Sequence, residues 1–178
     1  MADTTTTTTT TASPSYTQEQ FTLTNSSHVQ AALSFLSLAG TMYMGLGQTS
    51  AWSDDTNPPV CDPTATVVNQ VFGYKAVTSC QLVRAPQNGE TVPDTAITYR
   101  GSQWIIVASA DAYTQDATYI YVSTDFIGSE IPLDTYRQIG LFLGLQPKSG
   151  VSQPNLLPSQ VQSTGTLYFY ANHVPITR

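Results

Sequence analysis

Short strand-like segments in the second half of the chain constrain the fold more than any other feature. Residues 95–99 and 103–109 flank Arg100-Gly101-Ser102, which favours a tight hairpin turn. Residues 117–123 read Ala-Thr-Tyr-Ile-Tyr-Val-Ser, and side chains of this β-branched and aromatic kind are enriched in strands. Three such segments, close together in the sequence, predict an antiparallel sheet.

Other segments extend this pattern toward both ends of the chain. Residues 76–84 alternate with a period of two and predict a strand, and Asn88-Gly89 predicts a turn because both residues tolerate positive φ. Residues 67–74 could form one or two helical turns. Residues 136–145 fit a helix or a buried strand, and periodicity alone does not decide between the two.

The last part of the chain contains a long polar connection. Residues 146–164 carry three prolines and one glycine among Ser and Gln, a composition that predicts an irregular loop. Loops of this length are usually functional or flexible. Residues 166–170 then predict one more strand.

One helix is expected before these strands. Apolar residues recur at spacings of three and four from Val29 to Ala39, which is the pattern of an amphipathic helix. Ser26 or Ser27 would cap its start and Gly40 would end it, so we expect the helix over about residues 27–39. The predicted fold class is therefore mainly β (α+β with one N-terminal helix), an antiparallel, sandwich-like domain with long irregular loops.

The N-terminal residues differ from the rest in composition. Residues 1–15 include eight consecutive threonines, Thr4 to Thr11, and a polar tract of this kind buries too little surface to offset the entropy of ordering it. We expect an arm that is disordered, or that orders only against a partner by adding to the edge of a neighbour's sheet. Residues 16–178 would form a single domain.

The charged residues are few and dispersed. They make up 10% of the chain, which is low for a soluble domain, and the six Lys and Arg residues form no basic stripe. A surface for nucleic acid is therefore not expected. The apolar run over residues 31–47 is interrupted by Ser and Thr and is too short to span a bilayer, and no signal peptide precedes it. We expect that the protein is made in the cytoplasm and does not contact a membrane.

The residues that could carry chemistry form no recognisable catalytic or metal-binding pattern. Cys61 and Cys80 lack zinc-ligand spacing, and we expect two reduced, buried thiols rather than a disulfide. His28 and His173 have no nucleophile elbow to serve, and the chain has no phosphate-binding loop. We expect neither an enzyme nor a cofactor or metal site.

The segment from Tyr43 to Pro59 has the most distinctive sequence. Tyr43 lies in a strand that is interrupted by Gly45 and Gly47, which permit positive φ or the close approach of another chain segment. Next comes a loop with one tryptophan, two acids and two prolines. Its members are Trp52, Asp54, Asp55, Pro58 and Pro59. The two acids could bind calcium, but no Asp-x-Asp-x-Asx-Gly loop surrounds them, and solvated turn residues are the simpler interpretation.

Arg137 is the charged residue with the most unusual position. It lies in an otherwise apolar segment, where a guanidinium group is costly to bury unless it is paired. It could reach water at the end of a strand. Alternatively, it could pair with a carboxylate of this chain or of a neighbouring subunit.

Three motifs in order resemble baseplate wedge proteins of contractile-tailed (T-even-like) phages. They are the Tyr43-to-Pro59 pattern, the segment Tyr136-Arg137-Gln138-Ile139-Gly140-Leu141-Phe142, and residues 165–178 with their Asn-His-Val-Pro-Ile-Thr-Arg ending. The resemblance covers roughly residues 20–178 and favours a strand over residues 136–145.

The resemblance implies a structural subunit of the virion, located in the tail baseplate and assembled in the host cytoplasm. Its partners would be other baseplate and tail proteins, and it would scaffold them during assembly and contraction. The subunit-interface residues would be Tyr43, Gly45, Gly47, Trp52, Asp54, Asp55, Pro58, Pro59 and Arg137. The alternative is a host-surface or carbohydrate-binding tail-fibre module, because ten tyrosines with many Asn, Thr and Gln also suit sugar recognition.

Overall fold

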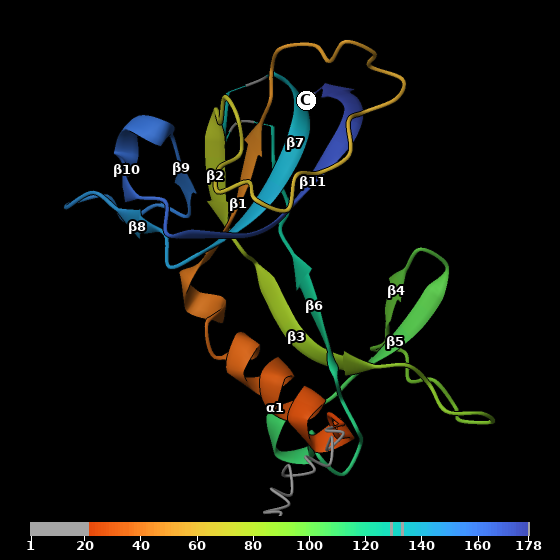
Figure 1. Cartoon of the computed structure of the whole chain (residues 1–178). Helices are drawn as coiled ribbons and strands as arrows, with labels where there is room; N and C mark the ends of the chain where they lie inside the picture. Colours follow the sequence, from red (N-terminus) through yellow and green to blue (C-terminus); the bar gives the residue numbers. More distant parts are fainter. Residues whose placement is uncertain (1–21, 129, 133, 178) are drawn as a thin grey trace, which may run out of the picture.

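A computed structural model describes residues 22–128, 130–132 and 134–177 of the chain. The predicted arm over residues 1–15 lies outside the described residues. The described elements are one α-helix, three short 3-10 turns and eleven strands, all paired antiparallel (Figure 1). The mainly β fold with a single N-terminal helix is confirmed.

The larger sheet has five strands in the order β11-β7-β1-β2-β9. Their bounds are β1 (Met42–Gly47), β2 (Gly73–Ala76), β7 (Thr135–Leu143), β9 (Asn155–Leu156) and β11 (Thr166–Thr177). The central strand β1 has β2 on one side and β7 on the other. A small two-stranded sheet, β8 (Gln146–Pro147) with β10 (Val161–Ser163), lies beside it, next to the 3-10 turn η3 (Pro158–Gln160).

The smaller sheet has four strands in the order β4-β5-β3-β6. Their bounds are β3 (Ser79–Arg84), β4 (Ile97–Tyr99), β5 (Ser102–Ile106) and β6 (Tyr119–Ser123). The helix α1 (Asn25–Leu36) packs against β3 and β6. The predicted hairpin is present, and its turn consists of Arg100 and Gly101, both with positive φ (49° and 79°), as a tight two-residue turn requires.

The chain passes between the two sheets three times, so it forms two regions that are each discontinuous in sequence (Figure 1). We call residues 22–41 and 78–123 the helix region, which contains α1, the turns η1 (Ala39–Thr41) and η2 (Ser109–Asp111), and the four-stranded sheet. We call residues 42–77 and 124–177 the strand region. Where the segments cross, the Thr78 N–H donates to the Ser123 carbonyl (3.0 Å) and the Thr124 hydroxyl to the Ala76 carbonyl (3.0 Å).

Each region has its own hydrophobic cluster. The cluster of the helix region consists of Val29, Ala32, Leu82, Val107, Ala112 and Ala117. The cluster of the strand region consists of Val68, Tyr74, Phe142, Leu145 and Leu156. In the strand region the rings of Tyr74 and Phe142 meet edge to face at 5.3 Å between centroids, a favourable geometry for aromatic pairs.

The helix differs from the prediction by about two residues at its start and three at its end. Thr24, rather than Ser26 or Ser27, is the N-cap, because its hydroxyl and carbonyl oxygens both accept from the Ser27 N–H (3.4 and 3.0 Å). The helix ends at Leu36 with Ser37 as the C-cap, and Gly40 lies in the turn η1.

Three predictions about segments of the strand region need correction. The helical turns considered for residues 67–74 do not form. Instead, Val68 packs in the hydrophobic cluster of the strand region, and Gly73 is the first residue of β2. The irregular loop expected over 146–164 contains β8, β9 and β10, and β9 completes the larger sheet because Leu156 is buried beside Tyr74. The strand expected over 166–170 continues to Thr177 through two shifts of register.

The remaining strand predictions are confirmed with small shifts of boundary. The segment 136–145 forms the strand β7 (Thr135–Leu143), as the family resemblance favours, and the strand ends before Gly144. The segment 76–84 is split, because β2 ends at Ala76 and β3 starts at Ser79 in the other sheet. Gly89 has a φ of 78°, as expected for the Asn-Gly turn.

Candidate subunit interface

The two glycines of β1 are required by packing. A Cβ atom on Gly45 would lie 2.8 Å from the Phe142 ring, and one on Gly47 would lie 2.3 Å from the Asn69 carbonyl oxygen. Both glycines are buried and neither has positive φ. Of the two roles that the sequence allowed, close approach is therefore the one observed, and these residues position the loop that follows β1.

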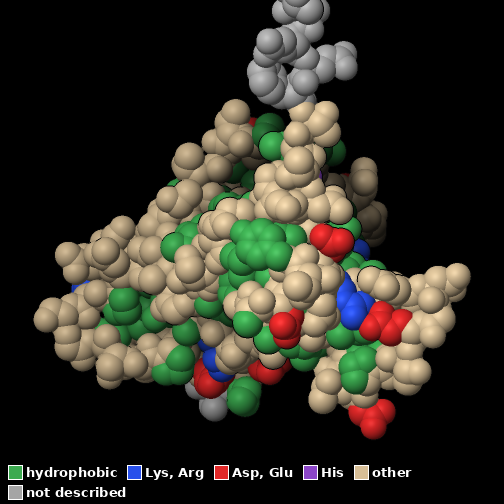
Figure 2. All heavy atoms as spheres, turned by 90° about the horizontal axis from the view of Figure 1, so that it is seen from below, with side chains coloured by type: hydrophobic (Ala, Val, Ile, Leu, Met, Phe, Trp, Pro, Cys, Tyr) green, Lys and Arg blue, Asp and Glu red, His purple; other side chains and the backbone are tan. Residues whose placement is uncertain are grey.

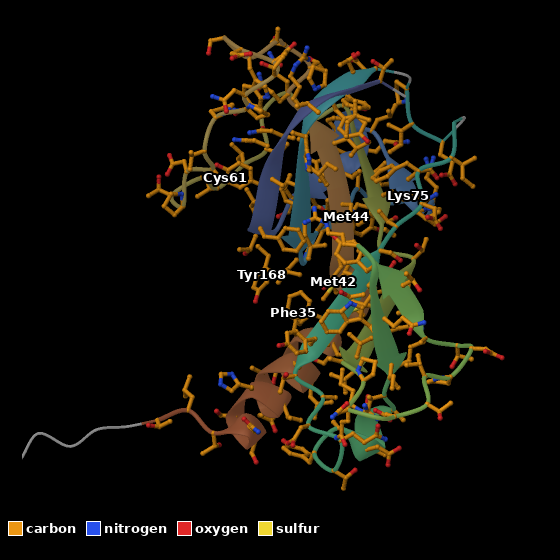
Figure 3. The ribbon with its side chains drawn as sticks, turned by 90° about the vertical axis from the view of Figure 1, so that its right-hand side faces the viewer. Phe35, Met42, Met44, Cys61, Lys75 and Tyr168 are labelled. Atoms are coloured by element: carbon orange, nitrogen blue, oxygen red, sulfur yellow. The ribbon has the colours of Figure 1, made fainter. Side chains whose placement is uncertain are left out.

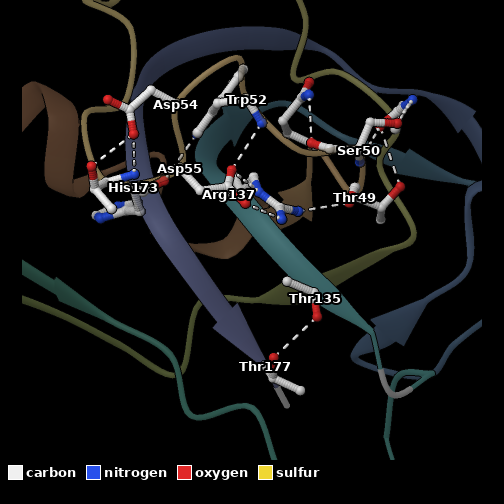
Figure 4. A network of polar contacts seen from close by, with 12 residues as sticks. Thr49, Ser50, Trp52, Asp54, Asp55, Thr135, Arg137, His173 and Thr177 are labelled. Carbon is white, nitrogen blue, oxygen red and sulfur yellow. Dashed lines mark hydrogen bonds and ion pairs between the residues drawn. The ribbon is translucent and has the colours of Figure 1, made fainter.

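Arg137 is the residue that fastens this loop to the sheet. It lies on β7 and is 7% exposed, and its guanidinium group forms a two-pronged pair with Asp55, with Nε and Nη2 each 2.7 Å from a carboxylate oxygen (Figure 4). The third nitrogen, Nη1, donates to the Thr49 carbonyl at 2.7 Å. The planar fork of arginine suits this geometry, and the hydrogen bonds from Arg137 hold the pKa of Asp55 below its usual value.

Trp52 turns inward and adds a second attachment. Its indole N–H donates to the His173 carbonyl on β11 (3.1 Å), and its backbone N–H donates to the Asp55 carboxylate (2.8 Å). The ring is half-buried. The loop is therefore attached to β11 through Trp52 and to β7 through Asp55.

The neighbouring acid, Asp54, faces solvent. Its carboxylate accepts from the backbone N–H and the hydroxyl of Thr56 (2.9 and 2.7 Å), and these hydrogen bonds lower its pKa. Asp62 repeats the arrangement with Thr64 (2.8 and 2.7 Å). Both are local turns that fix the backbone of the loop.

The second half of the loop is held by β11. The Asn172 side-chain amide donates to the Pro59 carbonyl (2.8 Å), and the Tyr170 hydroxyl accepts from the Asp62 N–H (2.5 Å). The buried side chain of Gln138 connects the end of the loop to this strand, because it accepts from the Asn69 N–H and donates to the Asn172 side chain (both 2.9 Å).

The two ends of the loop have strained backbone conformations and are hydrogen-bonded to each other. Gln48 and Gln70 have positive φ values of 56° and 47°, which side chains other than glycine rarely adopt. The Gln48 N–H donates to the Asn69 carbonyl (2.6 Å), and the Gln70 side chain bonds the backbone N–H and the hydroxyl of Ser50 (2.9 and 2.8 Å). No sequence signal identifies these positions, because glutamine has no preference for positive φ.

The outer surface of the loop is exposed although its backbone is held. We call residues 54–63 the loop rim. Asp54, Pro59 and Asp62 are exposed there, and Val60 is 95% exposed, the highest fraction among the exposed large apolar residues described. Nothing in the sequence distinguishes Val60 from the other valines of the chain. The ordered backbone and the exposed outer side chains make the loop rim the candidate contact surface.

The predicted interface residues therefore divide into two groups. Tyr43, Gly45, Gly47, Trp52, Asp55 and Arg137 lie within the strand region or fasten the loop to it. Asp54 and Pro59 are exposed on the loop rim, and Pro58 beside them is half-buried. The carboxylate pairing considered for Arg137 is present, and the partner belongs to the same chain.

The thiols and other reactive groups do not converge on this loop. Cys61 and Cys80 are both free, as expected, but they are half-buried rather than buried. Burial raises the pKa of the Cys80 thiol. Among the described residues, no three His, Cys, Asp or Glu side chains are grouped as a metal ion would require. In the same part of the chain, no helix has the length and apolar character needed to cross a membrane.

Comparison with known proteins gives two matches. A family model described as "Baseplate wedge 3 tail fiber network component" matches residues 22–178. "Virion protein 3" of Enterococcus phage phiEF24C is 32% identical over 149 residues, which cover 84% of this chain and 82% of that protein. The family match includes both regions and the whole loop, and it starts after the threonine tract.

Proposed function

The chain belongs to the family of baseplate wedge 3 tail fiber network components, and from this premise we propose that it is a scaffolding subunit of a contractile phage tail. It holds neighbouring baseplate proteins in register while the tail is assembled in the host cytoplasm and when it contracts. Its partners are proteins rather than nucleic acid or membrane. No covalent chemistry and no cofactor enter this role.

The observation that supports this role most strongly is the loop rim on its fixed base. A contact loop that is already ordered loses little entropy when a partner binds, so more of the contact energy contributes to affinity. Arg137 of β7 and Asn172 of β11 supply that order, and Trp52 of the loop adds a hydrogen bond to β11. Burying a side chain such as Val60 in a partner contributes about 1.5–3 kcal/mol.

The surface composition agrees with extensive protein contacts. Figure 2 shows a face on which charged side chains are scattered among apolar and uncharged polar ones. Fourteen large apolar side chains in the described part of the chain are substantially exposed. Charged residues are depleted at the centres of protein interfaces, where apolar and aromatic residues are enriched.

Incorporation of variants into virions tests the proposal. Val60→Asp places a charge at the centre of the loop rim and touches no core residue, so we expect the purified protein to keep its melting temperature and the virions to contain much less of it. Ile127→Asp is the matched control, because Ile127 is also exposed (62%) but lies outside the loop rim. The amount of each variant in purified phage is measured by quantitative mass spectrometry. Normal incorporation of Val60→Asp would remove the loop rim from the interface.

The alternative function, recognition of host-surface sugars, has one structural feature in its favour. Tyr99, Trp104 and Tyr119 line a hollow on the four-stranded sheet, and sugars stack on aromatic rings. However, its lining contains no carboxylate, amide or basic side chain to bond sugar hydroxyls. Binding of the purified protein to a glycan array, abolished by Trp104→Ala, would favour this alternative over scaffolding.

A further inference from the structure

The strand β6 has one unpaired edge. It is the last strand in the order β4-β5-β3-β6, and it pairs with β3 from Tyr119 to Ser123. No other strand in the described part of the chain pairs with it. An open edge of this kind presents free backbone N–H and C=O groups to which a further strand can bond.

A hollow of about 590 Å³ lies on the helix side of this edge. Its walls are α1, through His28, Ala31 and Phe35, and β6, through Tyr119, Ile120 and Val122. The start of β11 borders it, and the rings of Phe35 and Tyr168 approach to 4.9 Å between centroids (Figure 3).

A second hollow of about 320 Å³ adjoins β6 as well. It is lined by the aromatic side chains of Tyr99, Trp104, Tyr119 and Tyr121. The rings of Trp104 and Tyr119 lie 5.1 Å apart and those of Tyr99 and Tyr121 lie 6.4 Å apart, both nearly edge to face. Tyr99 and Tyr119 are about half exposed (51% and 55%).

The two hollows share residues of β6 and therefore border the same strand. Tyr119, Ile120 and Val122 line both, together with Phe169 of β11. Successive side chains of a strand point to opposite faces of its sheet, so a strand added beside β6 would direct its side chains alternately into one hollow and the other. This is the arrangement by which an extended peptide is recognised at a sheet edge.

The chemistry of the lining specifies an uncharged occupant. Neither hollow is lined by Asp, Glu, Lys or Arg, and a buried charge there would have no partner. Residues 4–18 of this chain carry no charged side chain and begin with eight threonines, which are strong strand formers. This segment matches the edge in charge, and its β-branched side chains suit a pleated surface.

We propose that the N-terminal segment of a second copy of this chain, within residues 4–18, binds along the free edge of β6 as an added strand. Residues 1–21 precede the described chain and could reach about 70 Å if extended. Thr24 before α1 is extended (φ −87°, ψ 163°) and Leu23 is 73% exposed, so the described chain begins in solvent, where it can reach a second copy. The interaction requires only copies of this chain and does not depend on the baseplate role.

Photo-crosslinking in the full chain identifies the occupant directly. A benzophenone amino acid replaces His28, which is exposed and lines the first hollow. Unlabelled and ¹⁵N-labelled proteins are mixed at high concentration and irradiated, and the products are analysed by mass spectrometry. Cleavage after Glu19 separates residues 1–19 from the peptide that carries position 28, and the isotope pair shows whether two copies are joined.

We expect cross-links between position 28 of one copy and residues 4–18 of another. The matched control carries the same group at Ser34, which is exposed on α1 but lines neither hollow, and it should lose these cross-links. Replacing Thr4–Thr11 by alternating Gly and Ser, which keeps the length but removes the preference for strands, should reduce the yield several-fold. Cross-links within one copy, cross-links to other parts of the second copy, or equal yields from positions 28 and 34 would each overturn the proposal.

Discussion

The two regions of the molecule differ in the kinds of side chain that they bury. In the strand region, the buried polar residues Lys75, Arg137 and Gln138 all have partners. Lys75 pairs with Glu130, and Arg137 and Gln138 hold the loop that follows β1. Because burying an unpaired charge or amide is costly, these pairings define one arrangement of the sheet and its loops.

The helix region has no buried polar or charged residue in the described part of the chain. Its buried cluster contains only apolar side chains, and three of its six members are alanine. Its aromatic residues lie outside this cluster, with Tyr99, Tyr113 and Tyr119 each about half exposed, and the edge of β6 is open. The strand region thus pairs its buried polar groups within one chain. In the helix region, the exposed aromatic rings and the open edge of β6 lie side by side and form a surface that a partner could cover.

The largest expected effect concerns the two cores. Phe142→Ala should lower the free energy of unfolding by about 3–5 kcal/mol and Leu82→Ala by about 2–5 kcal/mol, because both residues are at most 2% exposed. The chain has two tryptophans, Trp52 in the strand region and Trp104 in the helix region, so single Trp→Phe backgrounds report on each region separately. We expect Phe142→Ala to lower the midpoint seen by Trp52 more than that seen by Trp104, and Leu82→Ala to do the reverse.

The same two variants also show whether the two regions unfold independently. If both reporters shift equally for both variants, the two regions unfold as one cooperative unit. The difference between them would then concern surface chemistry alone and not local stability.

The next effect separates two adjacent acids of the strand region. Asp55→Ser removes the partner of Arg137 and frees the loop, so the melting temperature should fall by several degrees and chymotrypsin should cleave faster after Trp52. Asp54→Ser is the matched control, because Asp54 is exposed and bonds only the turn at Thr56 and Asn57. Equal cleavage rates for the two variants would show that the Arg137 pair does not hold the loop.

A smaller effect concerns the ion pair of the helix region. Hydrogen bonds from Arg84 and from the Gln87 N–H lower the pKa of Glu90 from 4.5 to about 2. Because the folded-state pKa is lowered, the contribution of Glu90 to stability is complete above pH 4.5 and is lost as the pH falls toward 2. The difference in melting temperature between the native protein and Glu90→Gln should therefore be largest near neutral pH and should become smaller as the pH falls toward 2. A difference that stays constant with pH would contradict this pairing.

The smallest expected effect is none at all. Cys61 lies in the loop of the strand region and Cys80 in β3 of the helix region, and both are free. A reductant should therefore leave the unfolding midpoint unchanged. A lower midpoint with reductant would show a covalent link between the regions and would remove the basis for treating them separately.

The elements that the sequence predicts well are those in which neighbouring residues share one preference. The aromatic and β-branched run that ends at Ser123 forms β6, and the Arg100-Gly101 turn forms as expected. The need of Arg137 for a partner also follows from sequence, because an arginine in an apolar strand is costly unpaired.

The features that the sequence does not reveal depend on contacts between distant residues. Asp54 and Asp55 are chemically identical, and only the position of Arg137 on β7 decides which one turns inward. Leu156 lies in a proline-rich segment whose composition indicates a loop, yet it pairs with Tyr74 and completes the larger sheet. The exposure of Val60 likewise follows from the hydrogen bonds that hold the backbone on either side of it.

Hydrogen–deuterium exchange on the isolated protein and on assembled baseplates tests most directly whether the loop rim and the edge of β6 are contact surfaces. We predict that assembly adds protection at the loop rim, residues 54–63, and along β6, while the exchange of β1 and β7 stays unchanged because those strands are already paired on both sides. If the loop rim and β6 exchange equally fast before and after assembly, neither is covered by a partner. Neither the loop rim nor the edge of β6 would then be a contact surface.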